Sequence, residues 1–132
     1  MAPQKEDGML KDGIAQATLP AADLERAKGF WTKVGLSPIS ELPGGIEYET
    51  SGGTSFTVYP TRNPNRGGHT QLHFRVNDIE SEVADLRAKG IVFEEYDFPA
   101  LKTEHGIATT ESGKGAWFKD EDGNIIGVFQ RN

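Results

Sequence analysis

One segment of the chain occurs twice, and this repeat restricts the folds that the sequence can adopt. Residues 15–36, "AQATLPAADLERAKGFWTKVGL", align with residues 70–91, "TQLHFRVNDIESEVADLRAKGI", at an offset of 55 positions. The glutamines, the aspartates and the closing glycines of the two copies coincide in this alignment. A repeat of this length corresponds to one supersecondary unit used twice. The sequence therefore predicts two modules with the same internal plan.

Each copy has the pattern of a strand followed by a helix. Asp23 and Asp78 stand where an N-cap residue is expected, and apolar residues at helical spacing follow both. Gly35 and Gly90 are placed to end the helices. We expect the apolar stripe of each helix to pack on a sheet.

Short strand candidates follow each helix. In the first copy they are residues 36–42, 45–50 and 54–60, which are separated by "PGG" and "SGG" turns, and in the second they are 91–98, 115–120 and 124–130. Residues 99–114, "PALKTEHGIATTESGK", show no clear period, so we expect a mobile loop, and whether it acts as a lid stays open. The order strand-helix-strand-strand-strand, used twice, predicts an α+β fold.

Composition excludes several classes of function. The 132 residues suffice for one domain, and the absence of cysteine excludes disulfides and thiolate chemistry. A net charge of −6 argues against nucleic acid, and no apolar run approaches the roughly 20 residues that a membrane span needs. Residues 1–11 lack a secretory pattern and are expected to be a flexible tail, and residues 61–68 a linker. We therefore expect a cytoplasmic protein.

The paired helix segments and the closing "AWFKDEDGNIIGVFQ" resemble the vicinal-oxygen-chelate superfamily, which includes glyoxalase I, bleomycin-resistance proteins and extradiol dioxygenases. Glu121 replaces the proline that is usual in the family's hairpin turn. The resemblance covers about residues 12–131. It implies a single domain over 12–132, with modules at about 12–62 and 69–131. In such proteins two βαβββ modules form a cupped mixed β-sheet around a cavity, with helices on the outer face and commonly a homodimer.

The resemblance also indicates where a metal would sit. Metal-dependent members take ligands from four strand positions, which map here to Gln16, Thr57, Gln71 and Gly127. Catalytic metal centres need imidazole or carboxylate donors, whereas this set offers two amides, one hydroxyl and no side chain at Gly127. We therefore expect neither a metal nor another cofactor.

Strand alternation selects the residues that would face a ligand. His69 and His73 would stand about 13 Å apart along one strand, which is too far for easy chelation of one ion. Each aromatic candidate could instead pack in the core. His69 and His105 are expected at the surface. The predicted ligand-binding residues are Gln16, Thr18, Tyr48, Thr57, Tyr59, Gln71, His73, Trp117 and Phe129.

Two functions remain open. One is a metal-free small-molecule binding protein of the glyoxalase/bleomycin-resistance type, which holds an aromatic or antibiotic-like ligand in the sheet cavity. The other is an enzyme of the same fold, a lyase, isomerase or dioxygenase-like protein, that uses His73 with or without a displaced metal. In that case Glu47 is the candidate base, provided that the strand register turns Glu47 and Glu49 inward.

Overall fold

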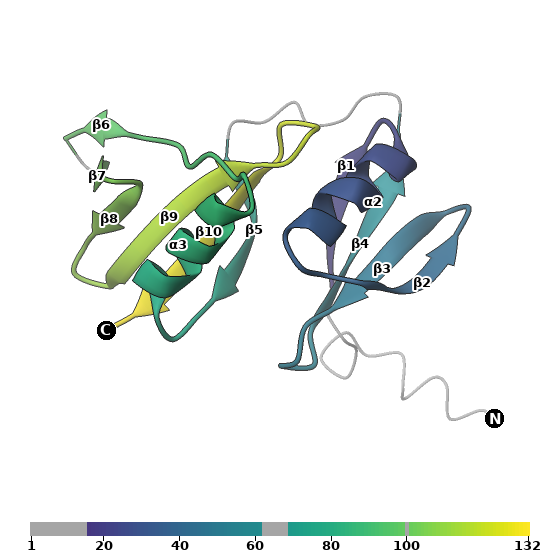
Figure 1. The fold of residues 1–132 in the computed structure, drawn as a ribbon, viewed down its shortest axis with the longest axis horizontal. Helices are drawn as coiled ribbons and strands as arrows, with labels where there is room; N and C mark the ends of the chain where they lie inside the picture. The colour runs from purple at the N-terminus through teal and green to yellow at the C-terminus, as the bar shows by residue number, and fades with distance from the viewer. Residues whose placement is uncertain (1–15, 62–68, 100) are drawn as a thin grey trace, which may run out of the picture.

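The computed structural model describes residues 16–61, 69–99 and 101–132 and contains two helices and two mixed β-sheets (Figure 1). The expected tail over 1–11 and nearly all of the expected linker lie outside the described residues. The α+β class and the twofold use of one module are as the sequence predicts. Neither described helix is long and apolar enough to cross a membrane.

The first module forms a four-stranded sheet in the order β1-β4-β3-β2. Its first strand is parallel to its last, and the other pairs are antiparallel. The elements are β1 (Ala17–Ala21), α2 (Leu24–Lys33), β2 (Pro38–Leu42), β3 (Gly45–Glu49) and β4 (Ser55–Pro60).

The second module repeats this plan and extends it to six strands, in the order β5-β10-β9-β8-β7-β6. Again the first strand is parallel to the last. The elements are β5 (Thr70–Arg75), α3 (Ile79–Ala88), β6 (Asp97–Phe98), β7 (Leu101–Glu104), β8 (Ile107–Thr109), β9 (Gly113–Lys119) and β10 (Ile125–Arg131).

The helix boundaries follow from the signals in the sequence. The Asp23 carboxylate accepts hydrogen bonds from the N–H groups of Glu25 and Arg26, at 3.0 and 3.2 Å, so two of the free donors of the first turn are satisfied. Asp78 accepts one such bond, from the Ser81 N–H at 3.2 Å. The two helices are equal in length and lie 55 positions apart, so the repeat is structural.

The structure corrects two predictions between α3 and β9. Residues 91–98 were expected to be a strand, but only Asp97–Phe98 is one, and Phe93 forms an isolated bridge with Phe118. Part of the expected mobile loop over 99–114 is the hairpin β7–β8 instead. His105 and Gly106 both have positive φ, 55° and 82°, which is the conformation of a two-residue turn whose twist matches the strands. As a result, β8 lies fourth in the order of this sheet, the position that β2 has in the sheet of the first module.

Both helices lie on the same side of the two sheets, and one core joins the modules (Figure 1). Trp31 on α2 is 1% exposed, and its ring lies 6.4 Å from that of Phe74 on β5. Phe30 on the same helix reaches Phe118 on β9, with ring centroids 6.2 Å apart. The helix of the first module therefore packs on residues of both sheets.

A polar contact fixes the modules at one end. The Asp122 carboxylate, in the loop between β9 and β10, accepts hydrogen bonds from the Ala22 N–H at 3.0 Å and from Arg26 at 2.9 Å. Its side chain is 2% exposed. The buried Asn124 amide donates to the Pro20 carbonyl at 3.0 Å. The "DEDGN" loop thus ties the second module to the start of α2.

Candidate functional site

The predicted binding residues lie, with one exception, on the sheet faces that point away from the helices, which we call the open faces. Adjacent side chains of a strand point to opposite faces, so residues that alternate with core residues lie on the open face. In the first module Thr18 and Glu47 both pair with Thr57, and Tyr59 follows on the same strand. This open face is mainly polar.

The register of β3 and β4 decides the orientation that the sequence left open for two carboxylates. Glu47 stands opposite Thr57 and Glu49 opposite Ser55, so both carboxylates are on the open face. The Gln16 amide donates a hydrogen bond to Glu47 at 3.1 Å and another to the Ser55 hydroxyl. Gln16 and Glu47 are therefore joined as a donor–acceptor pair.

The open face of the second module is aromatic. Gly127 pairs with His73 on one side and with Trp117 on the other. The His73 ring lies 6.1 Å from that of Phe129. The structure thus brings these three predicted residues, His73, Trp117 and Phe129, to one surface.

Two further rings, which the sequence interpretation missed, extend this surface. The Tyr96 ring meets Trp117 edge to face at 5.6 Å and stacks on Phe98 at 6.0 Å. Phe98 is 58% exposed. The alternation in residues 94–98, "EEYDF", carried the signal, because Tyr96 and Phe98 share a face of an extended segment. We call His73, Tyr96, Phe98, Trp117 and Phe129 the aromatic patch.

Gly127 is small for a physical reason. A Cβ at this position would lie 3.1 Å from the His73 Cβ and 3.4 Å from Thr70 and Trp117. The glycine therefore lets the His73 and Trp117 side chains approach each other across the strand. A larger residue here would push the patch apart.

Tyr48 corrects the prediction that it faces a ligand. It is 0% exposed and packs against Trp31 and Phe56, with ring centroids 6.1 and 5.3 Å away. Glu47 occupies the open face, so the next residue must point to the core. Burial raises the pKa of the Tyr48 hydroxyl, with a smaller effect of Glu41. The alternative of core packing holds for this aromatic residue.

Gln71 presents an unsatisfied acceptor. It is half-buried on β5, two positions before His73 and on the same face. Its Oε1 atom is buried and has no hydrogen-bond partner among the described residues. A buried acceptor without a partner is costly, so a hydrogen-bond donor at this point would stabilise the face.

The residues at the family's metal positions do not suit a metal. The Gln16 amide is already bonded to Glu47 and Ser55, and Gly127 has no side chain and a closely packed surrounding. Thr57 offers a neutral hydroxyl, which is a weak ligand for a transition metal. Within residues 16–61, 69–99 and 101–132, no group of three or more His, Cys, Asp or Glu residues is placed to hold an ion.

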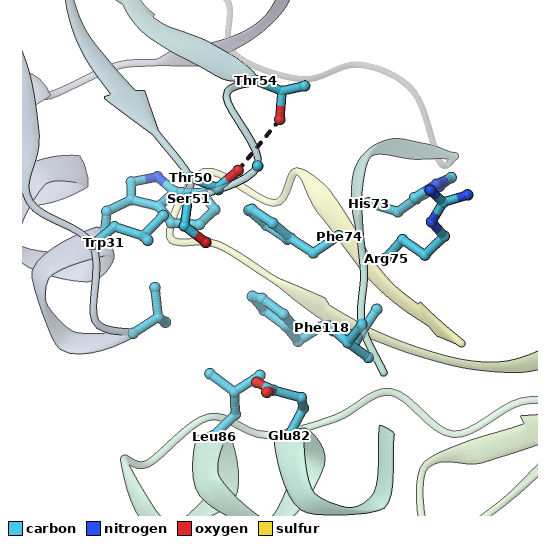
Figure 2. Close-up of a pocket in the computed structure, with 15 residues that line it drawn as sticks. Trp31, Thr50, Ser51, Thr54, His73, Phe74, Arg75, Glu82, Leu86 and Phe118 are labelled. Atoms are coloured by element: carbon cyan, nitrogen blue, oxygen red, sulfur yellow. Dashed lines mark hydrogen bonds between the residues drawn. The ribbon is translucent and has the colours of Figure 1, made fainter. Parts of the chain in front are cut away.

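A cavity of about 690 Å³ lies elsewhere, on the side of the sheets that carries the helices (Figure 2). Trp31, Phe74 and Phe118 form aromatic walls, and Leu86 and Glu82 of α3 approach from the opposite side. The loop between β3 and β4 contributes residues 50–52 and 54 to the lining. The sequence interpretation did not anticipate this cavity, because its walls come from both modules.

The alternation of β5 and β9 gives the sheet a cavity side and an open side, and His73 of the aromatic patch borders the cavity as well. Phe74 and Phe118 point into the cavity, whereas the preceding residues, His73 and Trp117, belong to the open face. Figure 2 shows the His73 and Arg75 side chains on the other side of β5 from Phe74. One sheet therefore has two aromatic surfaces, back to back.

Comparison with known proteins gives the family. Residues 13–128 match the model of the glyoxalase/bleomycin resistance protein/dioxygenase superfamily. No curated protein matches the chain.

Several solved structures share the fold. An antibiotic-binding protein from Streptomyces sp. CB03234 is 24% identical, with a TM-score of 0.71 over 94% of this chain and 99% of that one. A glyoxalase/bleomycin resistance protein from the same organism is 26% identical, with a TM-score of 0.65 over 89% of this chain and 100% of the other. A bleomycin-binding protein in complex with bleomycin is 18% identical, with a TM-score of 0.68 over 91% and 99% of the two chains. The chain belongs to the glyoxalase/bleomycin resistance protein/dioxygenase superfamily.

Proposed function

We propose that this protein is a metal-free binding protein, which holds an aromatic or antibiotic-like small molecule against its open faces. The aromatic patch is the observation that carries the proposal. Partly exposed rings in contact with one another provide flat apolar area for stacking, and such pairs contribute about 0.5–1.5 kcal/mol beyond burial. A planar ring system is the ligand group that suits this surface.

The polar atoms around the patch support the same proposal. The unpartnered Gln71 Oε1, within the described residues, accepts a hydrogen bond from a ligand N–H or O–H group. On the first module Glu47 supplies a carboxylate, which suits a ligand with a cationic group. Gln16, Thr18, Thr57 and Tyr59 complete the proposed ligand surface of that module.

The proposal includes a homodimer. Phe98 is 58% exposed, Leu42 67% and Tyr59 38%. Open faces with exposed apolar side chains are typical of surfaces that contact a partner or a ligand. A second copy placed on these faces encloses the ligand between two sheets, as a cavity lined by both protomers. We place this dimer in the cytoplasm, in keeping with a chain without cysteine.

The family supports small-molecule binding in general terms. The named relatives include an antibiotic-binding protein and a bleomycin-binding protein, both similar along nearly the whole chain. In the alternative of an enzyme that uses His73, the two candidate groups lie on different modules. Glu47 bonds to Gln16 on the first module, and His73 contacts Phe129 on the second.

The test measures binding of bleomycin and of a panel of planar antibiotics by thermal shift and fluorescence titration. A ligand that binds the native state raises the melting temperature. We expect Trp117→Ala to weaken binding about fivefold, since the lost stacking is worth roughly 1 kcal/mol. Val92→Ala is the control, because Val92 is 79% exposed and lies outside the patch.

Two further outcomes bear on the details. Binding that survives treatment with a chelator supports the metal-free form, and binding that is lost with the metal contradicts it. If the wild type and the Trp117→Ala variant bind every ligand with equal affinity, the proposal that ligands bind on the open face is wrong. Sedimentation of the free protein as a monomer at all concentrations would contradict the dimer.

A further inference from the structure

The cavity on the helix side has the size and lining of a ligand site. Its volume of about 690 Å³ lies within the range of roughly 300–1,000 Å³ that is usual for small-molecule pockets. Its aromatic walls are Trp31, Phe74 and Phe118, and the remaining apolar lining is aliphatic. The aliphatic lining residues are Val34, Leu36, Val76, Leu86 and Val128.

The polar lining comes from the β3–β4 loop, from Glu82 on α3, and from His73 and Arg75 on β5. The Thr50 and Thr54 hydroxyls are 3.3 Å apart and join the two ends of the β3–β4 loop (Figure 2). Ser51 lies between them in sequence and beside Trp31 in the same view. Apolar walls with a few hydroxyls at the border favour a ligand that is largely hydrocarbon.

The charge near the cavity limits the ligand further. Glu82 on α3 lies beside Leu86, and the Arg75 side chain lies across β5 from Phe74 (Figure 2). Both Glu82 and Arg75 belong to the cavity lining, so one side chain of each charge borders it. Because the two charges are opposite, the lining as a whole favours neither an anion nor a cation, and an uncharged ligand suits it best.

We propose that this cavity is a second binding site, on the helix side of the sheets, for an uncharged aromatic molecule. The shared sheet supports two sites, because Phe74 and Phe118 line the cavity while Trp117 lies on the open face, and His73 of the aromatic patch also borders the cavity. The proposal stands whether or not the open faces bind a ligand.

The test uses the neutral dye N-phenylnaphthylamine, whose fluorescence rises in apolar surroundings, and its anionic relative anilinonaphthalenesulfonate. Ser51→Phe places a ring at the cavity border from an exposed loop position. Ser112→Phe is the matched control, because it adds the same ring at an exposed turn that does not line the cavity. Far-UV circular dichroism and melting temperatures verify that both variants fold.

We expect the neutral dye to bind the wild type and the Ser112→Phe variant equally, and Ser51→Phe to weaken it about tenfold. We expect Glu82→Gln to strengthen binding of the anionic dye about threefold to tenfold and to leave the neutral dye unchanged. Failure of the neutral dye to bind, or equal binding to Ser51→Phe and the wild type, would overturn the second site. Loss of the dye in Trp117→Ala with retention in Ser51→Phe would place it on the open face and overturn the proposal equally.

Discussion

The two modules share one plan but bury different side chains. Helix α2 buries Ala27, Phe30 and Trp31, whereas α3 buries only Ile79 and Val83. The Trp31 ring has aromatic neighbours at 5.0–6.4 Å from α2, from its own sheet and from β5 of the other sheet. The first helix therefore holds the modules together, and the difference shows that a repeated backbone leaves the side chains free to specialise.

The open faces of the two modules also differ, because the first is mainly polar and the second is aromatic. The first module presents Gln16, Thr57 and Glu47, and the second presents the aromatic patch. Both modules keep large apolar side chains at the surface, Ile39, Leu42 and Tyr59 in the first and Val92 and Phe98 in the second. The second module, which carries the aromatic patch, offers most of the surface for stacking.

Truncation of the two helices gives the largest expected difference. Trp31→Ala should lower the free energy of unfolding by about 3–5 kcal/mol, because it removes a buried ring that contacts both sheets. Val83→Ala in α3 should lower it by only about 2 kcal/mol, in line with the smaller apolar volume removed. Urea denaturation of both variants measures the difference.

Equal losses of stability in Trp31→Ala and Val83→Ala would contradict the unequal roles of the helices. A Trp31→Phe variant provides an intermediate point, since it keeps an aromatic ring at the contact. Its loss should fall between that of the wild type and that of Trp31→Ala.

The N-caps sharpen the comparison at a smaller scale. Asp23→Ala should destabilise the protein by about 1–2 kcal/mol, because Asp23 accepts from two N–H groups. Asp78→Ala should lower the free energy of unfolding by about 0.5–1 kcal/mol, because Asp78 accepts a hydrogen bond from only one N–H group. The Ile79 N–H is already satisfied, since it donates to the Gln130 side chain at 2.8 Å. Thermal denaturation of the two variants, with the matching Asn substitutions as controls, gives the order. A larger loss of stability in Asp78→Ala than in Asp23→Ala would contradict the stronger capping of the first helix.

The contact between the modules predicts the smallest effect, a dependence of stability on pH. Burial raises the pKa of the Asp120 carboxyl above its ordinary value, although hydrogen bonds from Asn124 and Asp122 oppose the shift. Between the unfolded pKa, near about 4, and the raised folded pKa, the native state holds more protons than the unfolded state. Ionisation of Asp120 in this window therefore lowers the free energy of unfolding as the pH rises.

Asp120→Asn removes this contribution. Denaturation of the wild type and the variant over about pH 3 to 7 should show a difference in unfolding free energy that changes with pH in this direction. Identical pH profiles would mean that Asp120 titrates alike in the folded and unfolded states. Glu121→Gln is the control, because Glu121 lies in the same loop and is exposed.

Local signals in the sequence were sufficient for the repeat, both helices and most strands. Asp23, Asp78 and the two closing glycines act within a few residues of their own position, so their effect is visible without the fold. The hairpin over Leu101–Thr109 escaped detection, because its turn depends on His105 in a left-handed conformation that is uncommon for residues other than glycine.

What the sequence determined by itself was the family, the α+β plan and the alternation that places His73, Trp117 and Phe129 on one face. Only the tertiary structure decided that Tyr48 lies in the core, that Tyr96 and Phe98 extend the aromatic patch, and that a cavity lies between the modules. The reason is physical, because periodicity acts along a single strand or helix. The pairing of strands and the packing of α2 on two sheets depend on residues that are far apart in the chain, and their register is set only when the core forms.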